Sequence, residues 1–226
     1  MKVKTVLSYI LSLLLIPLVI ISGAVLFGKQ SYPAISAIVA ILACVPFFLT
    51  FEHERNTRKI VLLAVMTALC VAGRFIFAPV QFFKPVSAIV ILAGMYFGSQ
   101  FGFLTGALSA VVSDFYFGQG PWTPFQMFSW GLIGLLAGIL SRPLIKSKIV
   151  LLIYGAFSGV LFSLIMDVWT VLSLEGGVFN ISRFIAATST ALPVIVIYAV
   201  SNVLFLLILC PLFGRKIERL KTKYGV

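Results

Sequence analysis

Charged residues are scarce in this chain. They make up 10% of the 226 residues, while 61% are hydrophobic, and soluble domains carry about 25% charged residues. This composition excludes a soluble domain, a disordered segment, a secreted disulfide-rich domain and a coiled coil. Apolar runs recur along the chain, and each approaches the roughly 20 residues that a membrane-spanning helix needs. We therefore predict an all-α polytopic membrane protein, because the strands of a membrane barrel would alternate apolar and polar residues.

Residues that carry catalysis or bind metals are also few. The three cysteines, Cys44, Cys70 and Cys210, lie inside apolar runs without CxxC or Cys/His spacing, so neither a disulfide framework nor a zinc site is indicated. The single histidine, His53, lies in a charged segment. Walker A, HExxH and GxSxG motifs are missing from the sequence. We expect neither an enzyme nor a protein with a cofactor or a bound metal.

The apolar runs predict eight membrane spans. The runs are 6–27, 33–51, 60–78, 86–117, 124–140, 149–172 and 184–212. The run 86–117 is too long for one helix, and we expect it to be divided at Gly98-Ser99-Gln100. The last run is predicted to be one span that is tilted or kinked at Pro193.

Basic residues outnumber acidic ones by 17 to 6, for a formal net charge of +11. With the N-terminus in the cytoplasm, thirteen of the 17 fall in cytoplasmic segments, three (Lys29, Lys84 and Arg183) in external loops, and Arg74 inside a span. This asymmetry follows the positive-inside rule and predicts a cell-membrane protein with both termini in the cytoplasm. The basic charge therefore indicates a lipid bilayer as the partner and does not indicate nucleic acid.

The first two runs have a plain composition of Leu, Ile, Val and Phe and hold no ionisable residue at depth. The charged segment 52–59 follows them. We interpret residues 1–55 as an accessory transmembrane hairpin and residues 56–226 as a six-helix membrane core.

Small residues recur at intervals of three or four in the core, at Gly94, Gly98, Gly102, Gly106, Gly131, Gly134 and Gly138, and at Ala64, Ala68 and Ala72. Small side chains let helix backbones approach closely in lipid. We interpret the glycines as packing positions. The alanine stripe either packs internally or receives a helix of another protein, and the pattern by itself favours internal packing.

The segment 114–130, DFYFGQGPWTPFQMFSW, combines turn-forming residues with aromatic and amide side chains. Thr123 is expected to cap the helix that follows it. Trp122, Gln126 and Trp130 are spaced by four, which places them on roughly one side of that helix and its entry. Tryptophans also anchor helices at the bilayer interface. That alternative does not explain Gln126 and Trp130, which would lie about a turn or more inside the helix, so we favour a binding role.

Ionisable residues inside spans are costly and indicate function. Arg74, Asp114 and Asp167 are the three candidates, and all fall near the external side of the predicted topology, as does Trp169. Lys84 lies in an external loop. An ion pair between Arg74 and one of the aspartates would brace the helices, line a pocket, or do both.

From about residue 58 to residue 210, the chain resembles the substrate-binding S components of energy-coupling factor (ECF) vitamin transporters. The matching features are the six-helix core, the alanine stripe on its first helix, the run Lys84-Pro85-Val86 that opens the second, and the glycine-rich third helix that continues into FGQGPWTPFQM. This last stretch resembles the S components for cobalamin or its precursors. The hairpin of residues 1–55 departs from the usual six-span pattern.

The resemblance implies a subunit of an ECF-type ABC importer. It would capture a vitamin at the external face and deliver it inward together with a membrane coupling subunit and two cytoplasmic ATPases. The candidate substrate-binding residues are Arg74, Lys84, Asp114, Tyr116, Gln119, Trp122, Thr123, Gln126, Met127, Trp130, Asp167 and Trp169. The candidate partner-docking residues are Ala64, Ala68 and Ala72.

Residue types leave the substrate open. Aromatic and amide side chains suit a flat apolar molecule with neutral hydrogen-bonding groups, such as a corrinoid or benzimidazole, a queuosine precursor or a pyridoxine-like ring. A stand-alone permease is an alternative of another class. It would need a polar path across the whole membrane, and the cytoplasmic halves of the predicted spans carry almost nothing polar.

Overall fold

A computed structural model describes residues 2–27, 32–51, 57–174 and 178–224, and these residues form helices and no strands. The elements are α1 (Lys2–Ile10), the π-helical segment η1 (Leu11–Leu15), α2 (Ile16–Phe27), α3 (Tyr32–Phe51), α4 (Thr57–Ile76), α5 (Val86–Phe97), α6 (Ser99–Phe117), α7 (Thr123–Ile139), α8 (Ser141–Lys146), α9 (Lys148–Leu174), α10 (Ile181–Thr190) and α11 (Leu192–Tyr224).

Four of the described segments are long and apolar enough to cross a membrane: Val6–Gly23, Arg58–Ile76, Lys148–Leu174 and Leu192–Gly214. The helices α5 and α7 are also apolar but shorter. These features confirm the prediction of an all-α polytopic membrane protein. The number of eight spans and the division at residue 55 stay predictions.

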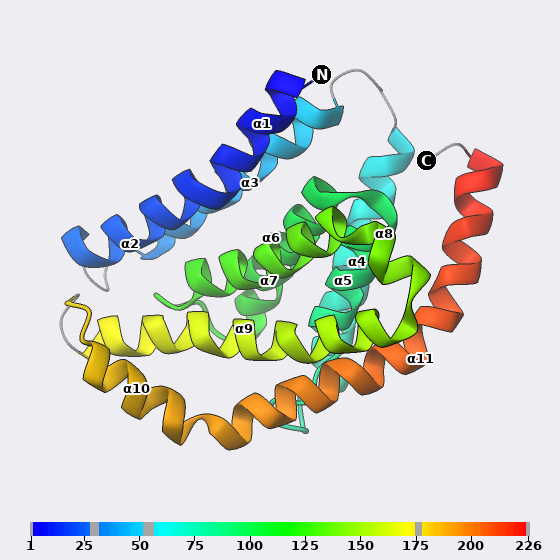
Figure 1. The fold of residues 1–226 in the computed structure, drawn as a ribbon. Coiled ribbons are helices and arrows are strands. Elements are labelled where there is room, and N and C mark those ends of the chain that lie inside the picture. Colours follow the sequence, from blue (N-terminus) through cyan, green and yellow to red (C-terminus); the bar gives the residue numbers. More distant parts are fainter. Residues whose placement is uncertain (1, 28–31, 52–56, 175–177, 225–226) are drawn as a thin grey trace.

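The N-terminal segments form a helical hairpin. The rod made of α1, η1 and α2 lies antiparallel to α3, and α3 packs against α6 and α7 (Figure 1). Two polar contacts join the rod to the start of α6. The Tyr9 hydroxyl lies 3.1 Å from the Ser99 hydroxyl, and Ser12 donates to Gln100 Oε1 at 3.3 Å. Because Ser12 and Gln100 are buried, this hydrogen bond supplies partners for groups that lipid cannot satisfy.

Glycines bring α5, α6 and α7 together at the centre of the molecule. A Cβ atom added at Gly94 or Gly102 would overlap the backbone of Gly134, and one added at Gly106 would overlap the backbone of Trp130. The packing interpretation is therefore confirmed for Gly94, Gly102 and Gly106 and is wrong for Gly98, where an added Cβ would meet no neighbouring atom. Gly98 lies between α5 and α6 with a φ of +103°, a conformation that a residue without a Cβ adopts without strain. The predicted break at this point is confirmed as well.

The last predicted span, 184–212, is interrupted close to the predicted kink at Pro193, and its long apolar helix begins only at Leu192. The chain forms two helices there, because α10 ends at Thr190 and α11 begins at Leu192. Pro193 is the second residue of α11, where a missing backbone N–H is tolerated; deeper in a helix its ring would clash with the carbonyl four residues earlier. The proline inside α11 is Pro211. α9 and α11 then run side by side along one edge of the molecule (Figure 1).

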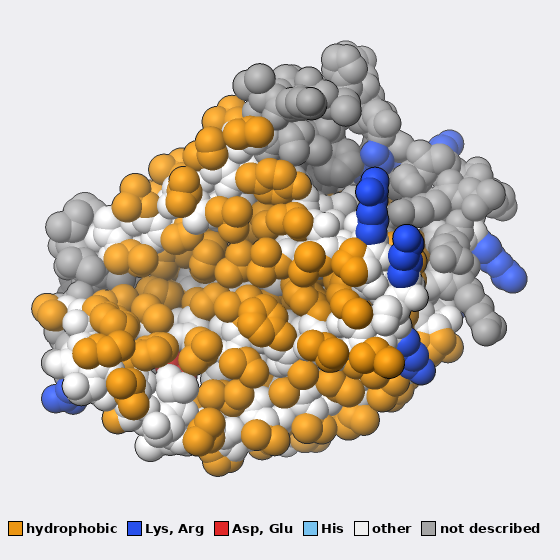
Figure 2. All heavy atoms as spheres, viewed as in Figure 1, with side chains coloured by type: hydrophobic (Ala, Val, Ile, Leu, Met, Phe, Trp, Pro, Cys, Tyr) orange, Lys and Arg blue, Asp and Glu red, His pale blue; other side chains and the backbone are white. Residues whose placement is uncertain are grey.

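The surface fits a lipid environment. Hydrophobic side chains cover most of the face shown in Figure 2, across several helices. Large apolar residues such as Ile60, Ile149 and Val196 are more than half exposed. Such a broad apolar surface is rare on soluble monomers. The described Lys and Arg side chains on this face gather mainly at the end where α8 and the later part of α11 lie (Figures 1 and 2).

Candidate substrate-binding cavity

A cavity of about 290 Å³ lies among α4, α5, α7, α9 and α11, at the end of the molecule where α4 finishes and α7 and α11 begin. The chain between α4 and α5 supplies one of its walls. The lining residues are Arg74, Gln81, Phe82, Lys84, Val86, Ser87, Gln126, Trp130, Phe162, Tyr198 and Asn202. Four of the predicted site residues, Arg74, Lys84, Gln126 and Trp130, are therefore brought together here.

An ion pair joins one lining residue of the cavity to a buried partner outside the lining. Arg74, in the last turn of α4, donates from Nη1 to Asp114 Oδ1 on α6 at 2.7 Å. The same guanidinium nitrogen donates to the Ser113 hydroxyl. Asp114 has no exposed surface, and the Arg74 side chain is 11% exposed. A charge buried this deeply in a membrane helix is stable only with a partner, so the pair fixes α4 against α6.

The second oxygen of the Asp114 carboxylate accepts from α7. Thr123 donates its hydroxyl to Oδ2 at 2.9 Å. Gln126 completes the cluster, because the amide orientation that pairs a donor with the carboxylate places its nitrogen 3.2 and 3.3 Å from the two oxygens. The carboxylate thus accepts from three side chains on two other elements and has little capacity left for a further partner.

The prediction that Thr123 caps α7 is wrong. The N-cap residue is Trp122, and no side-chain cap hydrogen bond is formed. Thr123 is the first residue of the helix, where its hydroxyl donates to the buried carboxylate of Asp114. A charge-assisted hydrogen bond is stronger than a neutral one, so the Thr123 hydroxyl bonds to the Asp114 carboxylate and does not cap the helix.

Aromatic side chains form the opposite wall. Trp130 stacks on Phe162, with ring centroids 5.2 Å apart and planes at 20°. Tyr198 meets Phe162 edge to face at 5.2 Å, and Phe82 meets Tyr198 in the same way at 5.8 Å. The Arg74 guanidinium lies 5.3 Å from the Trp130 ring centroid. Faces and edges of this kind suit a flat ring, which gains both apolar burial and aromatic contact.

Lys84 is held at the cavity by α11. Its backbone N–H donates to the Ser201 hydroxyl at 3.0 Å, and that hydroxyl donates to the Lys84 carbonyl at 3.2 Å. The ammonium lies 5.1 Å from the Phe117 ring centroid, and the Arg74 guanidinium lies 4.7 Å from the same ring. Partial burial and the nearby Arg74 charge lower the pKa of Lys84 below its ordinary value.

The other eight predicted site residues lie outside the lining of this cavity; Asp114 and Thr123 support it as described above, and five more have other contacts. Gln119 donates to the Val111 carbonyl at 2.9 Å. Tyr116 is exposed and packs on Phe75. Met127 is fully buried in the core, and Trp169 packs against Phe125. The Trp122 ring covers Gly120, whose missing side chain leaves room for it.

Asp167 also lies away from Arg74. Its carboxylate accepts from the Thr188 hydroxyl on α10 at 3.1 Å. Of the two aspartates that could pair with Arg74, it is Asp114 that forms the ion pair in the structure.

Seven of the lining residues were not foreseen as site residues from the sequence, and the three of them that come from α9 and α11 are Phe162, Tyr198 and Asn202. Asn202 offered a signal, because an amide inside the apolar run 192–214 is as unusual as a charge at membrane depth. It donates to the Ser158 hydroxyl at 3.0 Å and to the Gly155 carbonyl at 3.2 Å, which joins α11 to α9. The two aromatic residues carried no comparable signal in a chain with 21 phenylalanines.

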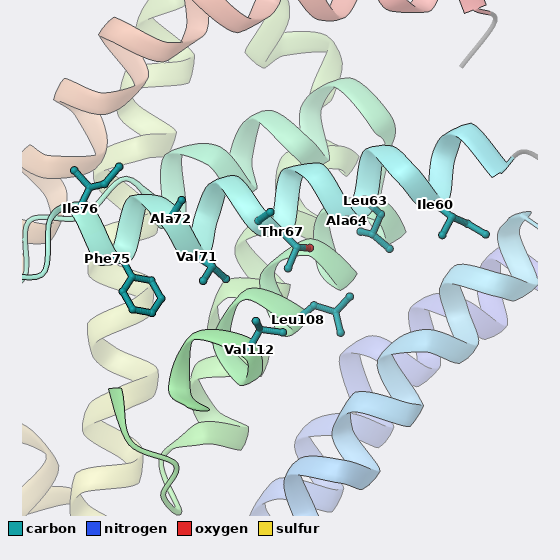
Figure 3. A pocket seen from close by; sticks show the side chains of 11 residues that line it. Ile60, Leu63, Ala64, Thr67, Val71, Ala72, Phe75, Ile76, Leu108 and Val112 are labelled. Atoms are coloured by element: carbon teal, nitrogen blue, oxygen red, sulfur yellow. The ribbon is translucent and has the colours of Figure 1, made fainter. Parts of the chain in front are cut away.

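The alanine stripe of α4 borders a second, apolar hollow of about 730 Å³ on the surface. Ala64, Ala68 and Ala72 are exposed, so they do not pack against another described helix of this chain. Leu108 and Val112 of α6 form the adjoining side (Figure 3). The internal-packing interpretation of this stripe is therefore wrong, and the surface is open to a partner.

The family comparison covers most of the chain. The family model described as ECF-type riboflavin transporter, S component, matches residues 54–219. The match begins after the N-terminal hairpin and includes every residue of the cavity. No solved structure matches the chain.

Proposed function

Because this chain belongs to the family of ECF-type riboflavin transporter S components, we propose that it captures a vitamin with a compact ring system in the cavity beside Arg74 and Trp130. The family consists of substrate-binding transport subunits and not of enzymes. The observation that carries the proposal is the combination, in one cavity, of stacked aromatic rings with fixed polar groups. Ligand sites are typically apolar clefts with a few well-placed polar groups.

The cavity size bears on the substrate. A volume of about 290 Å³ lies at the lower end of the roughly 300–1,000 Å³ of small-molecule pockets. A complete corrinoid is a macrocycle with a nucleotide tail, and such a cavity would hold only part of it. A fused ring system of the size of a flavin or of benzimidazole fits the space better. The resemblance to cobalamin-type S components therefore points to a precursor base, and the family description points to a flavin.

The proposed transport cycle needs partners. The exposed stripe of Ala64, Ala68 and Ala72 supports docking of a membrane coupling subunit, because small residues let a second helix approach closely. Two ATPases on the cytoplasmic side would supply the energy. We also propose that both termini are cytoplasmic, from the positive-inside asymmetry of the sequence. The cavity would then open to the outside.

Two measurements test this function. Mass spectrometry of small molecules released from the purified protein is expected to identify one ring-containing vitamin. Uptake of that vitamin in cells is expected only when the coupling subunit and both ATPases are produced with this protein. Uptake by this protein alone would instead identify a stand-alone permease. A periplasmically active reporter fused after Val226 should give no signal, and a signal would reverse the proposed orientation.

A further inference from the structure

The charges around the cavity do not balance. Asp114 and Asp167 are the two acidic side chains that the structure describes. The Asp114 carboxylate is occupied by Arg74, Thr123 and the Gln126 amide. Asp167 is outside the cavity lining and accepts from Thr188. Within the described part of the chain, one cation of the cavity is therefore neutralised and the ammonium of Lys84 has no carboxylate partner.

The unmatched ammonium lies at the cavity, and the backbone that carries it is fixed there. Both backbone polar groups of Lys84 are hydrogen-bonded to Ser201, and its side chain lines the same space as Arg74. The two cations lie over one ring, that of Phe117, at 5.1 and 4.7 Å from its centroid. A ring face attracts a cation but carries no net charge. The Lys84 ammonium thus faces a partly buried space beside the guanidinium of Arg74, which is already paired with Asp114, and charge repulsion and desolvation are stronger there than in water.

An anion in this space would relieve both costs. It would pair with the Lys84 ammonium, and the guanidinium of Arg74 has further N–H groups beyond the nitrogen that meets Asp114. The ring of the same ligand would then reach the aromatic wall of Trp130, Phe162 and Tyr198.

We propose that the substrate binds as an anion, with a carboxylate or phosphate group on Lys84 and Arg74 and its ring against Trp130. This inference rests on the proposed function and narrows its substrate class to acidic vitamins or phosphorylated forms. It departs from the neutral substrate that the residue types suggested, because the sequence did not reveal that Asp114 is fully occupied.

Matched ligand pairs provide the test. Calorimetry on the purified full-length protein would compare riboflavin with riboflavin 5′-phosphate, nicotinamide with nicotinate, and pyridoxal with pyridoxal phosphate. Within the pair whose ring fits, the acidic member is expected to bind at least about tenfold more tightly, as for one charge-assisted hydrogen bond. Lys84→Gln should remove this preference, and Lys84→Arg should retain it. Lys146→Gln, an exposed lysine on α8, is the matched control and should change nothing.

The outcomes separate this inference from the function on which it rests. Tight binding of a neutral member without preference for its acid overturns the anion proposal and leaves the vitamin-binding function intact. The same holds if Lys84→Gln keeps the preference while its melting temperature equals that of the parent. A neutral vitamin released from the purified protein also overturns it. Failure of every pair to bind, with no small molecule released, contradicts both the proposed function and the anion.

Discussion

The guanidinium of Arg74 on α4 and the carboxylate of Asp114 on α6 form an ion pair, with 2.7 Å between Nη1 and Oδ1 and no exposed surface on the aspartate. The pair joins two residues that lie 40 positions apart in sequence and on different helices. It also orients the face of Arg74 that lines the cavity. The same contact therefore braces two helices and positions Arg74 at the cavity that we propose binds the substrate.

Asp114→Asn is expected to lower the stability of the protein. Removing one member of a buried ion pair typically costs about 3–5 kcal/mol, because the other charge stays buried without compensation. Thermal unfolding in detergent should show a clear fall in the melting temperature. Asp167→Asn is the matched control, since Asp167 accepts one hydrogen bond from Thr188 and pairs with no described cation. A larger loss in the control than in Asp114→Asn would contradict the bracing role.

Trp130→Ala is expected to weaken vitamin binding about tenfold or more, because it removes an aromatic face that contributes about 0.5–1.5 kcal/mol beyond its buried area. Trp122→Ala is the matched control, because the Trp122 ring covers Gly120 and lies outside the cavity lining. Calorimetry with the vitamin that co-purifies with the protein would measure both. Equal losses of affinity in the two variants would contradict binding in the cavity and would place the site near the chain between α6 and α7.

The alanine groove yields a prediction about assembly. Ala68→Leu is expected to weaken association with the coupling subunit while vitamin binding by the isolated protein is unchanged, because added bulk separates helices that must touch. Ala186→Leu is the control, since Ala186 is also exposed but lies on α10. Co-purification of the coupling subunit would report assembly. An equal effect of both substitutions, or a loss of folding in Ala68→Leu, would count against docking at the groove.

Sequence reasoning was strongest where a residue type was costly in its setting. The charges of Arg74 and Asp114 stand out in apolar runs, and the structure pairs them. The same logic would have identified Asn202, whose amide joins α9 and α11. Helix breaks at glycine were also predictable, because Gly98 adopts a backbone conformation that other residues avoid.

Reasoning from proximity along the chain was weaker. The aromatic segment around Trp122 contributes Gln126 and Trp130 to the cavity lining. Trp122 packs on Gly120 instead, and Gln119 donates to a backbone carbonyl of α6. A spacing of four indicates a shared helix face but not the element that this face meets. The other half of the aromatic wall comes from α9 and α11, and only tertiary packing brings those helices to α7.

The last prediction concerns pH. Burial and the Arg74 charge place the pKa of Lys84 below its ordinary value, so Lys84 loses its proton at a lower pH than an exposed lysine. An anion binds the protonated form, and its affinity should be constant below this pKa. Above it, affinity should fall by up to about tenfold per pH unit, because binding must then recapture a proton. Calorimetry with the acidic ligand from pH 7 upward, through the ordinary pKa range of lysine, would follow the fall, since carboxylates do not titrate there.

Two variants isolate the contribution of Lys84 to this profile. An arginine keeps its charge throughout the range, so Lys84→Arg should flatten the alkaline fall while it retains affinity near pH 7. Lys84→Gln should bind weakly at every pH and show no alkaline fall. The direction of the change in affinity distinguishes the two kinds of ligand. A neutral ligand forms no ion pair with Lys84, so its binding should not weaken as the lysine deprotonates. An affinity that rises with pH in the parent protein would therefore rule out an anion on Lys84, whatever the substrate proves to be.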